Sequence, residues 1–182
     1  MIITIGSDKK TLQEAKKKLQ NIKKQIPQMI DEFYYSCYLK FVEYCRNYLF
    51  ASTIGENIKS EIALGWEYQR TNSGATFINK TEKAVFVEFG VGVVGLDNYH
   101  SNAKKENYNY NIGSKINADG SWIFNVTDKS DIDIESGFIL NETEHTVRTK
   151  GSPAVMYAFN ALEDLRFEYP KIWENIKIKY WG

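Results

Sequence analysis

Apolar residues in the first third of the chain recur at steps of three and four positions. The stripe consists of Leu12, Ala15, Leu19, Ile22, Ile26, Met29, Phe33, Cys37, Phe41, Tyr44 and Tyr48. This is the period of an amphipathic helix. Pro27 lacks an amide hydrogen and disfavours helical geometry at the residue before it. The pattern therefore predicts an N-terminal helical region over residues 1–54, with either two helices (about 8–25 and 28–51) or one long kinked helix.

Residues 58–150 have a pattern typical of β-structure. Residues 58–68 alternate in part, with an interruption at Gly65-Trp66, and residues 72–74 (Asn-Ser-Gly) predict a turn before a second hairpin arm at 75–79. Residues 83–89 (Lys-Ala-Val-Phe-Val-Glu-Phe) predict the best strand of the chain, because β-branched and aromatic residues favour pleated surfaces. Further short strands are expected at 122–126, 138–140 and 146–148.

Between these strands, residues 92–120 show no sustained periodicity and predict one long extended loop. Long structureless stretches inside a domain are usually functional or disordered. This loop carries a candidate protein-contact surface, because tyrosine offers amphipathic contact area at low entropic cost. Its residues are Lys104, Lys105, Tyr108 and Tyr110.

The last part of the chain, residues 152–182, predicts a C-terminal helical region. Ser152 is a favourable N-cap and Pro153 suits the first helical position, and an apolar stripe follows through Leu165. Pro170 is expected to end that helix, which leaves a short last helix or a tail. The whole chain, 1–182, is expected to be one α+β domain. In it, a long N-terminal helical region and a C-terminal helix pack on a small, mainly antiparallel sheet.

Composition narrows the classes of function. The chain has 182 residues, 43% of them hydrophobic, and its 23 basic and 23 acidic residues leave no net charge. A neutral chain gives no general reason to expect tight nucleic-acid binding. No segment approaches the ~20 apolar residues that span a bilayer, so we expect a cytoplasmic protein without a membrane partner. Cys37 and Cys45 lie on one predicted helix, ~12 Å apart along its axis, too far to form a disulfide.

Candidate catalytic residues are few. The two histidines, His100 and His145, lie in no metal-ligand spacing. Gly90, Gly92 and Gly95 match a bare dinucleotide-binding pattern, but no strand–helix–strand unit surrounds them. The sequence therefore predicts no catalytic residue, no metal and no cofactor, and we expect a protein that is not an enzyme.

Two segments carry a resemblance to a known family. The first is 84–92, Ala-Val-Phe-Val-Glu-Phe-Gly-Val-Gly; the second is 149–154, Thr-Lys-Gly-Ser-Pro-Ala, which leads into an apolar helix. In this order they resemble the head–tail joining, or tail-completion, proteins of long-tailed bacteriophages. In that family a "tyr-val-glu-phe-gly-thr-gly" strand precedes a "gly-x-pro-x-x-phe-met" helix start. The matching order spans roughly residues 1–166. The chain departs from the family pattern before the hairpin, where residues 51–57 replace "pro-val-asp-thr-gly-x-leu".

The resemblance implies a structural virion protein at the head–tail junction, assembled in the host cytoplasm. Its partners would be other copies of itself in a ring, neighbouring neck and tail proteins, and genomic DNA passing through the channel. The station within the neck stays open between tail completion, tail terminator and another ring. The matching residues would have structural roles; they are Glu88, Gly90, Gly92, Gly151, Ser152 and Pro153. Glu88 is expected either to bridge to a neighbouring subunit or to face water, and Gly90 and Gly92 to allow positive φ.

The charge pattern adds a hypothesis about ring contacts. Basic residues on the N-terminal helix and acidic residues near position 130 would form complementary patches that set the register between neighbouring subunits. They are Lys16, Lys17 and Lys18 on one side, and Asp128, Asp131, Asp133 and Glu135 on the other.

Two alternatives stay open. The first is a non-enzymatic binding module that holds a sugar or another planar ligand with its aromatic residues, namely Trp66, Tyr68, Tyr108, Tyr110 and Trp122. The second is a hydrolase that uses Glu88 or His145, for which the sequence offers no partner constellation.

Overall fold

A computed structural model describes residues 9–98, 100–103, 117, 119–125, 139–141 and 146–182. The acidic segment 128–135 and the candidate contact residues 104–110 lie outside these ranges. The fold is α+β, as predicted.

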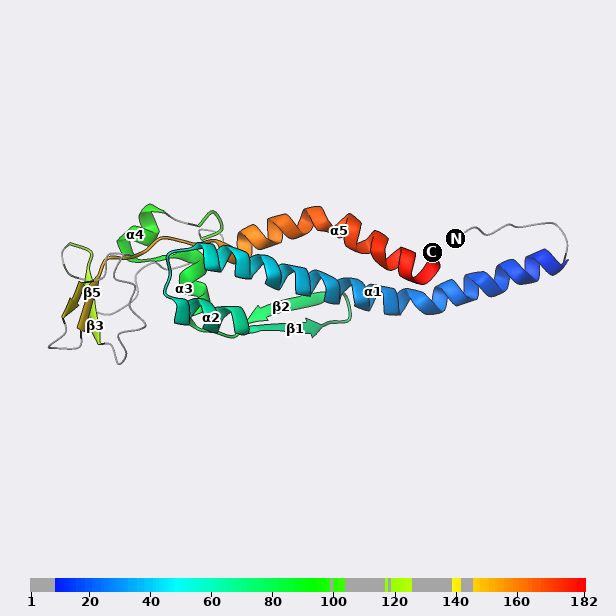
Figure 1. The fold of residues 1–182 in the computed structure, drawn as a ribbon, viewed down its shortest axis with the longest axis horizontal. Coiled ribbons are helices and arrows are strands. Elements are labelled where there is room, and N and C mark those ends of the chain that lie inside the picture. Colours follow the sequence, from blue (N-terminus) through cyan, green and yellow to red (C-terminus); the bar gives the residue numbers. More distant parts are fainter. Residues whose placement is uncertain (1–8, 99, 104–116, 118, 126–138, 142–145) are drawn as a thin grey trace.

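One helix, α1 (Lys9–Ala51), runs along most of the length of the molecule (Figure 1). Of the two arrangements left open by Pro27, the single helix is therefore the one observed. Pro27 lies on an exposed face of α1, so the backbone hydrogen bond that its missing amide costs is lost on the solvent side of the helix and not in the core. Of the predicted apolar stripe, Ala15, Met29, Cys37 and Phe41 are buried. After Phe41 the buried positions are Cys45 and Leu49, each one residue beyond the predicted Tyr44 and Tyr48, which are only partly buried.

The second long helix, α5 (Tyr157–Trp181), lies antiparallel along α1 (Figure 1). The Tyr48 hydroxyl donates to Asp164 at 2.6 Å near the start of α5. Near its end, the Lys179 ammonium lies 2.7 Å from Glu32. These two contacts join residues far apart in the sequence and fix the direction of packing.

Pro170 lies inside α5, so the prediction that it ends the helix was wrong. Leu165 before it and Ile176 after it are both buried. Packing therefore continues on both sides of the proline, and a helix so held bends at a proline instead of ending. Figure 1 shows this bend in the middle of α5.

The start of α5 also differs from the prediction. Ser152 and Pro153 do not begin the helix: Gly151–Ser152 form the short strand β6, and Ser152 forms a β-bridge with Val91. The helix begins after Met156, which adopts a left-handed conformation with φ 56°. This bridge fixes the chain at Ser152, and the four residues 153–156 connect it to the start of α5.

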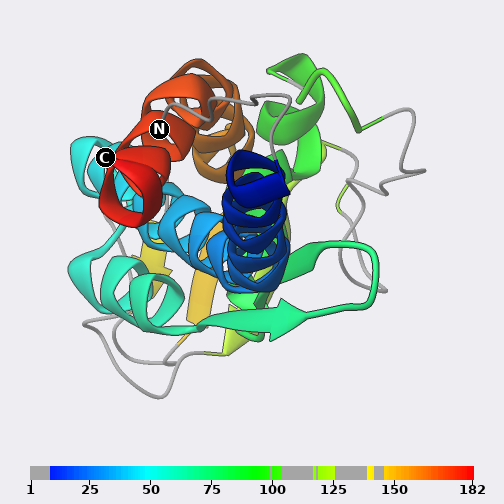
Figure 2. The same ribbon diagram turned by 90° about the vertical axis from the view of Figure 1, so that its right-hand side faces the viewer.

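A β-hairpin covers the side of α1 opposite α5 (Figures 1 and 2). Its strands β1 (Trp66–Arg70) and β2 (Ala75–Asn79) pair antiparallel around the predicted turn. Phe41 of α1 packs edge-on against Trp66 at a centroid distance of 4.8 Å. Three layers result, with α1 between α5 and the hairpin.

The residues before the hairpin form a helix, α2 (Glu56–Leu64), where the sequence predicted β-structure. Its buried residues are Lys59, Ile62 and Ala63. Their spacing of three and one places them on one helical face, whereas on a strand Ile62 and Ala63 would point to opposite faces. Burial against the core therefore selects the helix.

Residues 83–89 form helix α3 (Lys83–Phe89), so the prediction of a strand was wrong. The buried positions are Ala84, Val87 and Glu88, while Val85 and Phe86 are exposed. Steps of three and four bury one helical face. Tertiary contacts of that face outweigh the β-propensity of valine and phenylalanine.

At the end of the molecule beyond α3 lie α4 (Gly92–Asp97) and a three-stranded sheet. The predicted loop thus begins with a helical turn instead of extended chain. The sheet consists of β3 (Trp122–Asn125), β5 (Thr146–Thr149) and β4 (Ile139–Asn141), antiparallel in the order β3-β5-β4. These three strands confirm the predicted ones at 122–126, 138–140 and 146–148.

The hydrophobic core lies where α1, α2, α3 and α5 meet. It is built from residues four apart on the two long helices, from one residue of α2 and from two residues of α3. They are Cys37, Phe41, Cys45, Leu49, Ile62, Ala84, Val87, Tyr157, Ala161 and Leu165. Both cysteines are free, as predicted, and both are buried. Among the described helices, none has a stretch long and apolar enough to span a bilayer.

Candidate functional site

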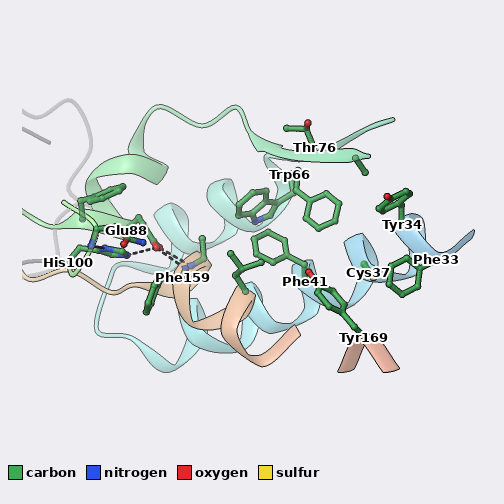
Figure 3. Close-up of a pocket in the computed structure, with 16 residues that line it drawn as sticks. Phe33, Tyr34, Cys37, Phe41, Trp66, Thr76, Glu88, His100, Phe159 and Tyr169 are labelled. Carbon is green, nitrogen blue, oxygen red and sulfur yellow. Dashed lines mark hydrogen bonds and ion pairs between the residues drawn. The ribbon is translucent and has the colours of Figure 1, made fainter. Parts of the chain in front are cut away.

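The residue that organises the site is Glu88, near the end of α3. Its side chain is buried, and its carboxylate faces the start of α5 (Figure 3). Oε2 accepts a hydrogen bond from the Ala158 amide at 2.8 Å, and Oε1 accepts one from the Phe159 amide at 2.9 Å. The Glu88 carboxylate is therefore bonded within the chain. The sequence had suggested instead that it bridges to a neighbouring subunit or faces water.

These two amides are the second and third of α5, and helical geometry leaves them without a partner in their own helix. The residue at the N-cap usually supplies the acceptor, but here it is Met156, which has none. A carboxylate from α3 takes that role, and its negative charge also lies at the positive end of the helix dipole. Glu88 is thus a helix cap provided from about 70 residues away.

His100 completes this cluster and is almost fully buried. Its Nδ1 accepts a hydrogen bond from the Asn102 amide at 2.9 Å. Nε2 therefore carries the ring hydrogen and donates to Glu88 Oε1, 3.1 Å away. The ring packs between Phe89 and Phe159, with centroid distances of 4.7 and 5.1 Å.

The backbone joins the same two segments. The Val155 amide donates to Val87 O at 2.9 Å, and the Met156 amide donates to Glu88 O at 3.2 Å. The pieces 84–92 and 149–159, which carry the family resemblance, are therefore in direct contact. We call this contact the α3–α5 joint; it consists of residues 84–91, His100 and residues 151–159.

Gly90 is required by this joint. It has φ 77°, which glycine adopts without strain, and a Cβ at this position would lie 2.6 Å from the Ala154 nitrogen. The prediction of positive φ is thus confirmed for Gly90, whereas Gly92 is the first residue of α4. Gly151, with φ 106°, gives the second segment a similar turn.

An open groove of about 790 Å³ runs from the joint along α1 (Figure 3). Glu88 and His100 lie at one end, and the rest of the lining is mostly aromatic, with Trp66 near the middle. The indole Nε1 of Trp66 is buried and has no hydrogen-bond partner in the described part of the chain. A buried donor of this kind is uncommon and suggests a place where an acceptor could bind.

The ionisable groups near the joint are not arranged as a nucleophile and base. Burial first, and the nearby Glu88 carboxylate second, raise the pKa of Cys45 and of Tyr157 above their usual values. Both groups are therefore kept protonated and unreactive. Among the described residues, no group of three or more His, Cys, Asp or Glu side chains could hold a metal ion.

The structure brings together only some of the residues singled out from the sequence. Glu88, Gly90, Gly151 and Ser152 meet in the α3–α5 joint, and Trp66 and Tyr68 lie together on β1. Lys16, Lys17 and Lys18 are exposed on α1, far from the joint. The remaining candidates lie outside the described side chains: Lys104, Lys105, Tyr108, Tyr110, Trp122, Asp128, Asp131, Asp133, Glu135 and His145. The proposed pairing of basic and acidic patches stays a prediction.

Sequence reasoning missed His100 as the partner of Glu88. The pair is separated by 12 positions, and no motif links it. The available signal was the helical spacing of Ala84, Val87 and Glu88, which would have placed the carboxylate on a buried face. A buried carboxylate requires a partner, and His100 was the one histidine near α3 in sequence.

Comparisons with known proteins add no relative to this description. No protein-family model matches the chain, and neither a curated protein nor a solved structure matches it significantly.

Proposed function

We propose that this chain is a structural protein of a tailed bacteriophage, or of a phage-derived particle, that joins the head to the tail. The observation that carries the proposal is the α3–α5 joint. The two segments that resemble the tail-completion family are about 60 residues apart, yet they contact each other through backbone bonds and through Glu88. In a structural protein, residues of a family pattern are expected at such joints.

The chemistry of the joint supports a structural role over a hydrolytic one. Both Glu88 oxygens accept hydrogen bonds from fixed donors, and His100 uses both ring nitrogens. A general acid or base needs an atom within reach of substrate. Here the acceptors are engaged in holding α3, α5 and the 100–102 turn together.

In this proposal several copies surround the tail axis as a ring and contact neighbouring neck and tail proteins, and genomic DNA passes through the channel. The protein would be assembled in the host cytoplasm and reside in the virion. Rings of this kind form when each subunit presents two different surfaces to its neighbours and the rotation closes.

The test is electron microscopy of particles released from cells in which only this gene is deleted. We expect separate DNA-filled heads and finished tails, and complete particles again when the wild-type gene is supplied from a plasmid. A matched complementation with Glu88→Ala should fail, while Glu43→Ala, on the exposed face of α1, should restore joining. Complete particles from the deletion strain would overturn the proposal.

A second candidate function is binding of a small planar or sugar-like ligand in the aromatic groove. The observation that favours it is that Trp66 lines the groove and that its buried Nε1 lacks an acceptor among the described residues. Titration with a panel of mono- and disaccharides should then change tryptophan fluorescence. Trp66→Phe, which keeps an aromatic ring but removes the donor, should weaken that binding. An unchanged wild-type signal across the panel would remove this candidate.

A further inference from the structure

The first part of α1 contains a seven-residue repeat. Residues 9–15 (Lys-Lys-Thr-Leu-Gln-Glu-Ala), 16–22 (Lys-Lys-Lys-Leu-Gln-Asn-Ile) and 23–29 (Lys-Lys-Gln-Ile-Pro-Gln-Met) each begin with two lysines. Each has apolar residues at its fourth and seventh positions. We call residues 9–29 the heptad segment. A spacing of three and four, repeated every seven residues, is that of the a and d positions of a coiled coil.

Within the molecule, α5 covers this apolar seam only at its end. Met29 is fully buried, and the next seam residue, Phe33, packs against Trp173 of α5 at 5.7 Å. At the end of α5, the Trp181 indole donates a hydrogen bond to the Gln25 side chain of α1 at 3.1 Å. Figure 1 shows α1 continuing well beyond this point.

Beyond the end of α5, the a positions of the seam are open. Leu12 is 49% exposed and Leu19 is 51% exposed, and Ile26, beside the end of α5, is 39% exposed. The d positions are less open, because Ala15 is buried and Ile22 is partly buried. The seam that α5 uses from Met29 onward thus continues with large apolar side chains at the surface.

The charges beside the seam indicate what kind of helix fits it. The heptad segment has seven lysines and one glutamate, a net charge of +6, and all seven lysines are exposed. In the register of the seam they occupy the e positions (Lys9, Lys16, Lys23), the f positions (Lys10, Lys17, Lys24) and one g position (Lys18). Residues at e and g select the partner of a coiled coil by their charge.

The heptad segment of a second copy of this chain fits poorly. In a parallel pair, Lys18 at g would face Lys23 at e of the partner copy. In an antiparallel pair, the e positions would face each other, lysine against lysine. Like charges across a coiled coil oppose association. Glutamates at the facing positions of another helix would instead be attracted to the lysines at e and g.

We propose that the heptad segment docks an acidic amphipathic helix of a partner protein, laid along α1 in line with α5. A membrane surface is the weaker alternative. Interfacial helices present a broad apolar face with large side chains, whereas this seam is narrow and includes Ala15. The docking site is independent of the head–tail proposal, because it rests on the heptad segment and not on the α3–α5 joint.

The test uses the full chain and a fluorescein-labelled acidic peptide of three heptads, with Leu and Ile at a and d and Glu at e and g. Binding is followed by fluorescence anisotropy, at low and at high salt. We expect saturable binding that weakens with salt. It should weaken at least about tenfold in the double variant Leu12→Asp/Leu19→Asp, which puts charge into the seam.

The matched control is Gln13→Asp/Gln20→Asp, which adds the same charge to the same turns at b positions, away from the seam. It should weaken binding by less than about threefold. Both double variants should keep the thermal midpoint of the wild type, because all four positions are exposed. Loss of binding in the seam variant is then not a loss of folding.

Three outcomes would overturn the proposal. One is no binding of the peptide up to about 0.1 mM. Another is equal loss of binding in the two double variants, since the attraction would then be electrostatic and would not depend on the apolar seam. The third is a different occupant: self-association of the chain that Leu12→Asp/Leu19→Asp abolishes, or seam-dependent binding to vesicles of phosphatidylserine and phosphatidylcholine without binding of the peptide.

Discussion

Replacement of Glu88 tests the central claim about the fold, that a carboxylate on α3 caps α5. In Glu88→Ala, the amides of Ala158 and Phe159 lose their acceptor, and so does the Nε2 hydrogen of His100. Hydrogen bonds to charged groups contribute about 1.5–3 kcal/mol each, and a buried donor left unpaired costs about 1–3 kcal/mol. The total cost is smaller than the sum of these three losses, because water can partly replace the acceptor at the amides of a first helical turn.

We therefore expect Glu88→Ala to lower the free energy of unfolding by about 3–5 kcal/mol, the range of breaking one side of a buried charged contact. Glu88→Gln should lower it by about 1–3 kcal/mol. Its amide oxygen can still accept from one donor, but its NH₂ group would face another donor. Since the free energy of unfolding of a small domain is only about 5–15 kcal/mol in total, either change should be measurable.

The assay is urea unfolding followed by circular dichroism, with Glu43→Ala as the control because Glu43 is an exposed partner of Lys40 on α1. The control should change the free energy by no more than about 0.5 kcal/mol. An unchanged slope of the transition would show that the same surface unfolds. If Glu88→Ala were as stable as the control, the carboxylate would not be the cap of α5.

Gly90→Ala should destabilise the fold by about 2 kcal/mol or more in the same assay, because φ is 77° and the added carbon meets the segment before α5, whereas Gly74→Ala should be nearly neutral. Burial raises the pKa of Cys37 to about 11, so the thiols of α1 should react with a disulfide reagent at about pH 8 only in denaturant; fast reaction of the folded protein would contradict their burial. The hydrogen bond from Lys179 lowers the pKa of Glu32, so this pair stabilises above the ordinary carboxyl pKa and less as pH falls through the lowered one. In Lys179→Gln, a carbon-detected NMR titration should show that pKa moving back up, and an unmoved value would exclude the pair.

The apolar pattern predicted the parts of the fold whose contacts repeat locally. The α1 stripe continues over many turns, so no other period fits it, and the hairpin is marked by its turn residues. The same holds for the strands near positions 122, 139 and 146, although their pairing order could not be read from the sequence.

Residues 83–89 show why other parts could not be predicted. Their run of valine and phenylalanine suits a strand, and the fact that decides for a helix is the position of the Glu88 partners at 100, 158 and 159. Those contacts are long-range, so a local window cannot identify the partners of Glu88. Pro170 was misjudged for the same reason, because α1 holds α5 on both sides of it.

The antiparallel packing of α1 and α5 has a consequence for how the chain folds. Roughly a hundred residues separate the end of α1 from the start of α5, so their contacts form only after a large loop closes. During synthesis, α1 therefore leaves the ribosome with its buried face, including Phe41 and Leu49, still exposed. Contacts of such high sequence separation slow folding. We therefore expect the chain to need chaperones until α5 has been synthesised. A variant with a shortened α5 should be insoluble and should not form a smaller folded protein.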